Sequence, residues 1–146
     1  HLNLKAYQQL LFTSMRYGEP RSLDGNSHHA VTPKTAILCV TGIAQPAPYV
    51  EHLKQMTDQI DHITFPDHHN YSDTDIKHIL QEYDKISSTD KCIFTTEKDA
   101  VRLTLCDIPE EIKRQIFYIP IEPEFLTPRD QLIKNIYDYV RQDTRK

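Results

Sequence analysis

The stretch A-I-L-C-V-T-G-I-A-Q-P-A-P-Y-V-E-H-L, residues 36–53, decides the class of fold. Its first six residues are almost continuously apolar, which is typical of a short strand buried on both faces of a parallel sheet. Gly42 follows directly, and the prolines after it suit the first turn of a helix whose apolar residues share one side. The stretch therefore predicts a strand and a helix in succession, the building block of an α/β domain.

The same alternation of strands and helices continues along the chain. Three more runs are rich in strand-forming residues: His62 to Phe65, Cys92 to Thr96 and Ile116 to Ile121. Between the first two of these, apolar residues recur at helical spacing behind Ser72, an N-cap residue with Asp75 three positions on. Another helical stretch begins near Asp99, and Pro109 is expected to break it into short pieces.

The N-terminal part differs in character from the rest. Residues 4–32 suggest extended structure with a turn at Gly18 and Pro20. Residues 24–29 are polar and predict a mobile loop. We therefore predict an extended β-type arm, serving as an interdomain linker, over residues 1–33.

The C-terminal end predicts a helix. Thr127 suits the cap and Pro128 the first turn, and apolar residues then line one face. We expect this helix to cover the outer side of the sheet. Residues 34–146 would then form a three-layer α/β domain with a mainly parallel sheet of four or five strands.

Composition limits the classes of function. At 146 residues, 38% of them hydrophobic, the chain is long enough for one soluble domain with a core. No apolar run approaches the ~18 residues of a membrane span, and a net charge of −4 disfavours binding to nucleic acid. Cys39, Cys92 and Cys106 form no C-x-x-C pair and predict reduced thiols in a cytoplasmic setting. Because the chain starts at a histidine without a signal peptide, we expect a piece cut from a longer protein.

Polar residues follow three of the predicted strands. In parallel α/β sheets ligands bind beyond the carboxyl ends of the strands, so these residues are the candidates for a site. They are Gly42 after the first strand, Asp67, His68 and His69 after the second, and Thr96, Glu97, Lys98 and Asp99 after the third. We expect the last two groups to lie on the same edge of the sheet.

Each group allows a functional and a structural interpretation. Asp67 can orient an imidazole or help to hold a metal ion, or it can cap the turn while both histidines are solvated. Thr96 to Asp99 lie where a strand meets a helix, a place where free N–H groups favour a nucleotide or phosphate. The alternative there is a capping box of Thr96 and Asp99 with a surface ion pair. Gly42 suits a close approach to a ligand or any tight turn.

Three motifs, in this order and spacing, resemble the C-terminal half of the tetraacyldisaccharide 4'-kinases (lipid A 4'-kinases). They are G-I-A-Q-P-A-P-Y at residues 42–49, F-P-D-H-H-N-Y-S at residues 65–72 and T-E-K-D-A-V at residues 96–101. The resemblance extends over residues 34–126, and R-Y-G at residues 16–18 is similar to the linker of the Bacteroidetes-type members.

The resemblance implies a kinase that moves the γ-phosphate of Mg²⁺-ATP onto the 4'-hydroxyl of the tetraacyldisaccharide 1-phosphate precursor of lipid A. The reaction would take place at the cytoplasmic face of the bacterial inner membrane. In such an enzyme His68 would pair with a catalytic aspartate of the N-terminal domain, with Asp67 beside it and His69 as the alternative. Strand-end geometry, rather than the resemblance, puts Gly42 and Thr96 to Asp99 near the nucleotide.

The sequence has no G-x-x-x-x-G-K-[ST] phosphate loop and no recognisable metal-ligand spacing. We expect the phosphate loop, the Mg²⁺ ligands and the peripheral membrane contact to belong to an N-terminal P-loop domain of the same protein. The isolated chain is then expected to hold no cofactor tightly and to be inactive.

Two other functions stay open. In a D-H-H-type phosphoesterase, Asp67, His68 and His69 would bind Mn²⁺, although the further aspartates that such a site needs are missing here. A non-catalytic α/β binding module would use the same polar loops to contact a partner protein.

Overall fold

A computed structural model describes residues 3, 5, 8, 10–126 and 129–143. The chain divides into two compact units, one formed by residues 1–17 with 121–146 and the other by residues 18–120. This division differs from the expected boundary between residues 33 and 34. The physical reason is strand pairing, because the first strand of the chain pairs with a strand that follows residue 120.

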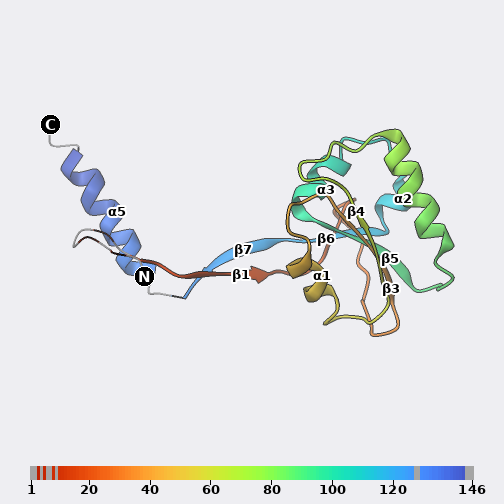
Figure 1. Cartoon of the computed structure of the whole chain (residues 1–146), viewed down its shortest axis with the longest axis horizontal. Coiled ribbons are helices and arrows are strands. Elements are labelled where there is room, and N and C mark those ends of the chain that lie inside the picture. The colour runs from red at the N-terminus through yellow and green to blue at the C-terminus, as the bar shows by residue number, and fades with distance from the viewer. Residues whose placement is uncertain (1–2, 4, 6–7, 9, 127–128, 144–146) are drawn as a thin grey trace. The chain divides into compact units, whose positions relative to one another are not determined.

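The unit of residues 18–120 contains a five-stranded sheet with strand order β2-β6-β5-β3-β4 (Figure 1). The strands are β2 (Arg21–Ser22), β3 (Ala36–Thr41), β4 (Ile60–Thr64), β5 (Lys91–Thr96) and β6 (Ile116–Ile119). The last four run parallel to one another, and only the short β2 is antiparallel to its neighbour β6. The predicted mainly parallel sheet is confirmed.

Helices cover both faces of this sheet. They are α1 (Ala47–Leu53), α2 (Asp73–Lys85), α3 (Glu97–Leu103) and α4 (Glu110–Lys113). The chain passes from β3 to its neighbour β4 and then returns across β3 to β5, so right-handed connections place α1 and α2 on opposite faces. Figure 1 shows α2 and α3 on one side of the strands and α1 on the other. The three-layer architecture is thereby confirmed.

The core lies between the sheet and the layer of α2 and α3. Buried aliphatic side chains of β3 and β5 pack there against α2, whose residues Ile76, Ile79 and Tyr83 form its inner face. The helix begins at the predicted capping box, in which the Ser72 hydroxyl accepts from the backbone N–H of Asp75. The sequence predicts this helix because cap and apolar periodicity agree.

The buried cysteines Cys39 and Cys92 lie within β3 and β5. Burial raises the pKa of each thiol to about 12, so both stay protonated and behave as small apolar side chains. Cys106 is partly exposed, and its pKa is also raised by burial. All three are free thiols in the structure.

The predicted strand from Ile116 to Ile121 is two strands. β6 ends at Ile119, and β7 (Ile121–Phe125) pairs with β1 (Thr13–Tyr17) in a separate two-stranded sheet. Pro120 lies between them and has no N–H to donate to a continuing ladder. Its carbonyl instead accepts a hydrogen bond of 2.8 Å from the N–H of Gly18.

The unit of residues 1–17 and 121–146 contains the antiparallel β1–β7 ribbon and α5 (Arg129–Asp143). Arg16 of β1 forms an ion pair with Glu122 of β7 across the ribbon. The predicted cap residues Thr127 and Pro128 lie outside the described residues. We expected this helix to cover the outer side of the sheet, but α5 belongs instead to the compact unit that contains β1 and β7.

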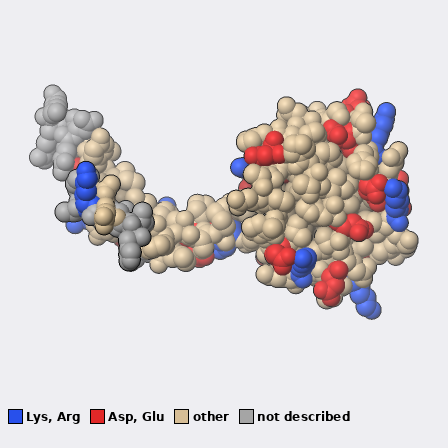
Figure 2. Space-filling model, viewed as in Figure 1, with Lys and Arg blue, Asp and Glu red and all other residues tan. Residues whose placement is uncertain are grey.

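The described helices and the face drawn in Figure 2 bear on what a membrane span or a polyanion site requires. Among the described residues, no helix is both long and apolar enough to cross a bilayer. On the face of residues 18–120 seen in Figure 2, acidic and basic side chains are interspersed. Such mixing gives no directional attraction to a polyanion on that face.

Candidate functional site

The polar loops after β3, β4 and β5 meet at one edge of the sheet. Because β3 lies between β4 and β5 and all three are parallel, their carboxyl ends are adjacent. The backbone N–H of His68, in the loop after β4, donates to the carbonyl of Gly42, which follows β3 (3.2 Å). Gly42 in turn donates its N–H to Asp99 of α3, which follows β5 (2.9 Å). The predicted D-H-H and T-E-K-D motifs are thus brought together.

The Asp99 carboxylate is the centre of this junction. The residue is completely buried, yet its two oxygens accept three hydrogen bonds. Oδ2 accepts from the N–H of Gly42 and, at 2.7 Å, from the hydroxyl of Thr96, and Oδ1 accepts from Arg102 at 2.9 Å. A buried charge needs such partners to be tolerated. Asp99 therefore joins the segment after β3 to the start of α3, and Gly42 and Arg102 extend the connection to the loop after β4.

The T-E-K-D motif divides into a buried and an outward pair. Thr96 is the N-cap of α3, and its hydroxyl accepts from the N–H of Asp99 (3.2 Å), as the capping interpretation predicts. Asp99 also forms an ion pair with Arg102, and this pair is largely buried. Lys98 is exposed and Glu97 is half-buried, both in the first turn of the helix. Of the four, these two are the ones that a ligand from solvent can reach.

Arg102 is a site residue that the sequence interpretation did not single out. It lies one helical turn beyond Asp99, and its Nη1 contacts both the Asp99 carboxylate and the carbonyl of Gly42 (3.3 Å). Its Nη2 lies 3.3 Å from Nδ1 of His68. The i,i+3 spacing of acid and base within α3 is the sequence signal that could have identified it.

His68 occupies the outer end of the loop after β4. Its side chain is 76% exposed, and its backbone has a φ of 58°, in the left-handed region that His, Asn and Asp adopt more often than other residues. The carboxylate of Asp67 accepts from the N–H of His68 (3.0 Å) and lies 3.7 Å from its Nε2. Asp67 thus caps the turn and also lies beside the imidazole.

His69 has a different environment from its neighbour. Its ring stacks on Phe65 at 4.7 Å, meets Tyr71 edge-on, and places Nε2 3.0 Å from a carboxylate oxygen of Asp75. That same Asp75 oxygen accepts from the backbone N–H and the hydroxyl of Ser72 at the start of α2. Hydrogen bonds from Ser72 and then from His69 lower the pKa of Asp75 to about 2. His69 is therefore part of the packing between loop and helix.

Gly42 is enclosed by the same groups. A Cβ at this position would come within 3.0 Å of an Asp99 carboxylate oxygen, 3.2 Å of the Tyr71 hydroxyl and 3.3 Å of Cβ of His69. Burial raises the pKa of the Tyr71 hydroxyl, and the negative charge of Asp99 raises it further. The absence of a side chain at Gly42 is thus required by close packing between the loops, and the residue itself is buried.

The site does not have the donor set of a metal centre. Within the described residues, no group of three His, Cys, Asp or Glu side chains could hold a metal ion. His69 is directed to Asp75, and the cationic Arg102 lies against Nδ1 of His68. A guanidinium beside a potential ligand nitrogen opposes a second cation there. This arrangement does not fit the Mn²⁺ site of the phosphoesterase alternative.

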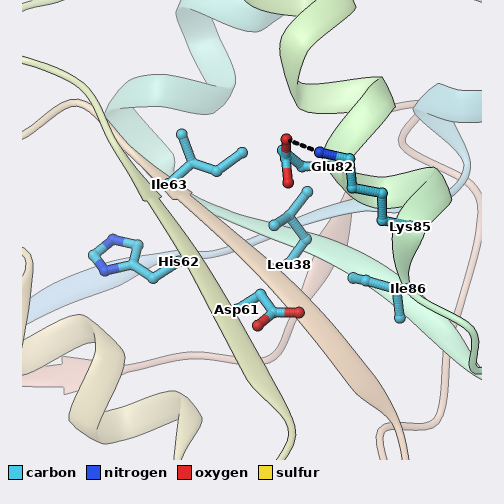
Figure 3. A pocket seen from close by; sticks show the side chains of 7 residues that line it. All are labelled: Leu38, Asp61, His62, Ile63, Glu82, Lys85 and Ile86. Atoms are coloured by element: carbon cyan, nitrogen blue, oxygen red, sulfur yellow. Dashed lines mark hydrogen bonds and ion pairs between the residues drawn. The ribbon is translucent and has the colours of Figure 1, made fainter.

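A pocket of about 310 Å³ lies beside the edge strand β4. Figure 3 shows residues of β4 facing the C-terminal part of α2, where Lys85 is bonded to Glu82. The pocket is lined by Leu38, Asp61, His62, Ile63, Glu82, Lys85 and Ile86. It shares no residue with the candidate site.

Comparison with known proteins adds a family match. The family model described as Tetraacyldisaccharide-1-P 4'-kinase matches residues 3–141. The tetraacyldisaccharide 4'-kinase of Bacteroides thetaiotaomicron is 45% identical over 157 residues, which cover 99% of this chain and 41% of the relative. That of Bacteroides fragilis is 38% identical over 154 residues, with the same coverage. The chain spans about two fifths of the length of these curated relatives.

A solved structure shares the fold. It is the crystal structure of the "apo" form of LpxK from Aquifex aeolicus in complex with ATP, which superposes with a TM-score of 0.55 at 15% sequence identity. The match covers 94% of this chain and 38% of that one. At this identity the likeness supports the fold alone.

Proposed function

The chain belongs to the tetraacyldisaccharide-1-P 4'-kinase family, and on that premise we propose that it is the C-terminal part of a lipid A 4'-kinase. The whole enzyme would transfer the γ-phosphate of ATP to the 4'-hydroxyl of the tetraacyldisaccharide 1-phosphate precursor of lipid A. The work of this part would be to complete the active site from the side opposite the phosphate loop.

The observation that carries this proposal is the different placement of two adjacent histidines. His68 is exposed at the outer end of its loop and held through Gly42 and Arg102, whereas His69 is bound into the packing of α2. An exposed imidazole on a firmly held loop suits contact with a second domain. There its Nε2 would donate to an aspartate that accepts the proton of the attacking sugar hydroxyl. Asp67 would stand beside it.

The other predicted site residues receive two kinds of role. Lys98, exposed in the first turn of α3, is the member of its motif that would approach the nucleotide phosphates, with Glu97 beside it. Thr96, Asp99 and Gly42 are buried and bonded to one another. They would act by holding the loops at the edge of the sheet.

ATP and Mg²⁺ need groups that these residues do not provide. None of the three glycines, Gly18, Gly25 and Gly42, belongs to a phosphate-binding loop motif, and the described residues hold no metal-ligand cluster. We assign the phosphate loop and the metal ligands to an N-terminal P-loop domain of the same protein. That domain would also carry the peripheral contact with the cytoplasmic face of the inner membrane.

A transfer assay on the full-length protein tests the proposal. With γ-³²P-labelled ATP, Mg²⁺ and a tetraacyldisaccharide 1-phosphate acceptor, we expect label in the lipid product. The 146-residue chain alone should turn over no ATP, because phosphoryl transfer needs the phosphate loop and its lysine. Absence of lipid labelling by a folded full-length protein, or ATP turnover by the isolated chain, would contradict the proposal.

A further inference from the structure

Arg102 has more contacts than an ion pair with Asp99 requires. Its guanidinium donates from Nη1 to the Asp99 carboxylate and the Gly42 carbonyl, and presents Nη2 to Nδ1 of His68. Its side chain is only 20% exposed, whereas that of His68 is 76% exposed. The arginine thus connects a buried carboxylate to an imidazole at the surface.

The direction of the His68 contact follows from the chemistry of the two groups. A guanidinium carries only donors and stays protonated in proteins, so Nδ1 of His68 must be the acceptor. In a neutral imidazole one nitrogen accepts and the other carries the proton. With Nδ1 as the acceptor from Arg102, the proton of a neutral His68 would lie on Nε2.

We propose that Arg102 is a positioning residue that holds His68 in the Nε2–H tautomer and in a fixed ring orientation. The inference rests on the proposed function, in which Nε2–H of His68 donates to a carboxylate of the other domain. A buried acid that fixes the tautomer of a catalytic histidine is a known arrangement. Here Asp99 would fix Arg102, and Arg102 would fix His68.

The groups that face the imidazole allow this assignment. Asp67 lies on the Nε2 side at 3.7 Å, where its carboxylate also favours a proton on Nε2. On the Nδ1 side lies Arg102, with its charge compensated by the buried Asp99. His69, the next residue, is directed to Asp75 instead.

The simpler alternative is that Arg102 only neutralises Asp99. Arg102→Lys separates the two, because a lysine can pair with Asp99 through a single nitrogen but has no second nitrogen to reach His68. A purely neutralising role would be rescued by lysine. A positioning role would not.

The kinetic test uses the full-length enzyme and a double-mutant cycle. Arg102→Lys should lower kcat about tenfold with little change in the KM for ATP. In a His68→Ala background the same change should cost nothing further, because its effect passes through His68. Wild-type kcat in Arg102→Lys, or equal losses in both backgrounds, would overturn the proposal.

A second measurement does not depend on activity or on the stability of any Arg102 variant. In full-length wild-type protein labelled with ¹⁵N-histidine, the His68 resonances are assigned by their loss in His68→Ala. Nδ1 should be the unprotonated nitrogen, and a protonated Nδ1 would overturn the proposal. If His68→Ala leaves kcat unchanged, the catalytic role of His68 fails, while the spectrum still decides the tautomer.

Discussion

The loop after β4 has two regions that differ although they are adjacent in sequence. The tip, Asp67 and His68, is exposed and bonded to Gly42 and Arg102. The root, Phe65, His69 and Tyr71, is partly buried and packs ring against ring, with His69 bonded to Asp75. The difference shows how a loop can present one functional side chain, because its neighbours supply the packing that keeps the backbone in place.

Replacing Asp99 by Ala should have the largest effect, because Gly42 and Arg102, which hold the tip, are both bonded to its carboxylate. The change would leave Arg102 without its buried partner and the N–H of Gly42 without its acceptor. We expect a loss of about 3–5 kcal/mol in the free energy of unfolding. Urea denaturation measures it, with Asp99→Asn as the control that keeps shape but not charge and should lose less. A variant as stable as wild type would show that the loops do not depend on Asp99.

The tip should matter for catalysis and not for folding. In the full-length enzyme, His68→Ala should lower kcat roughly 10- to 1,000-fold with nearly unchanged nucleotide affinity, because only transition-state stabilisation is lost. His68→Asn is the matched control, since asparagine tolerates the positive φ of this position. Steady-state kinetics in which His68→Ala and His69→Ala have equal, small effects would remove the distinction between tip and root.

The root should matter for stability and little for kcat. His69→Ala removes the ring stacked on Phe65 and the hydrogen bond to Asp75. We expect the free energy of unfolding to fall by about 1–2 kcal/mol. Thermal or chemical denaturation of His69→Ala and His68→Ala measures the difference. The free energy of unfolding of His68→Ala should be close to that of the wild type. The idea fails if His68→Ala is the less stable of the two.

The smallest expected effect is a loss of stability at low pH that depends on Asp75. Because the pKa of Asp75 is lowered to about 2 in the folded protein, its ionised form stabilises the fold above the usual pKa near 4. That contribution is lost as pH falls from about 4 through 2. In the Asp75→Asn variant, the urea concentration at the midpoint of unfolding should therefore fall less between about pH 4 and pH 2 than in the wild type. An identical pH profile in wild type and variant would show that Asp75 does not contribute.

The sequence allows the sheet to be predicted well, and the site only in part. β3 begins and ends at the predicted residues, because a run buried on both faces must be apolar throughout. The break at Pro120 was missed because Ile119 and Ile121 are equally suited to one strand, although a proline inside a predicted strand argues against its continuing. Whether β7 joins the sheet depends on its pairing with β1, more than a hundred residues away.

At the site, the sequence indicates which loops meet but not which side chains are buried. Asp99 is fully enclosed and Lys98 exposed, although both are charged and adjacent. Successive residues of a helix point to different sides, so Lys98 and Asp99 have different surroundings. The Asp99 carboxylate fits where it is because Gly42, which lies against it, has no side chain. The i,i+3 spacing to Asp99 points to Arg102, but its contacts with Gly42 and His68 join segments that are far apart in the sequence, so these two contacts could not be predicted.

The hydrogen bond between Gly18 and Pro120 joins the first and last residues of the sheet unit. The two ends of the unit of residues 18–120 are therefore adjacent in space, as they are in a domain inserted into another sequence. A segment of this kind suits circular permutation, because joining its ends needs only a short peptide. New termini could then be opened in a surface turn such as residues 24–27. The whole α/β unit, with its tip and root intact, could then be transferred as one segment between homologues.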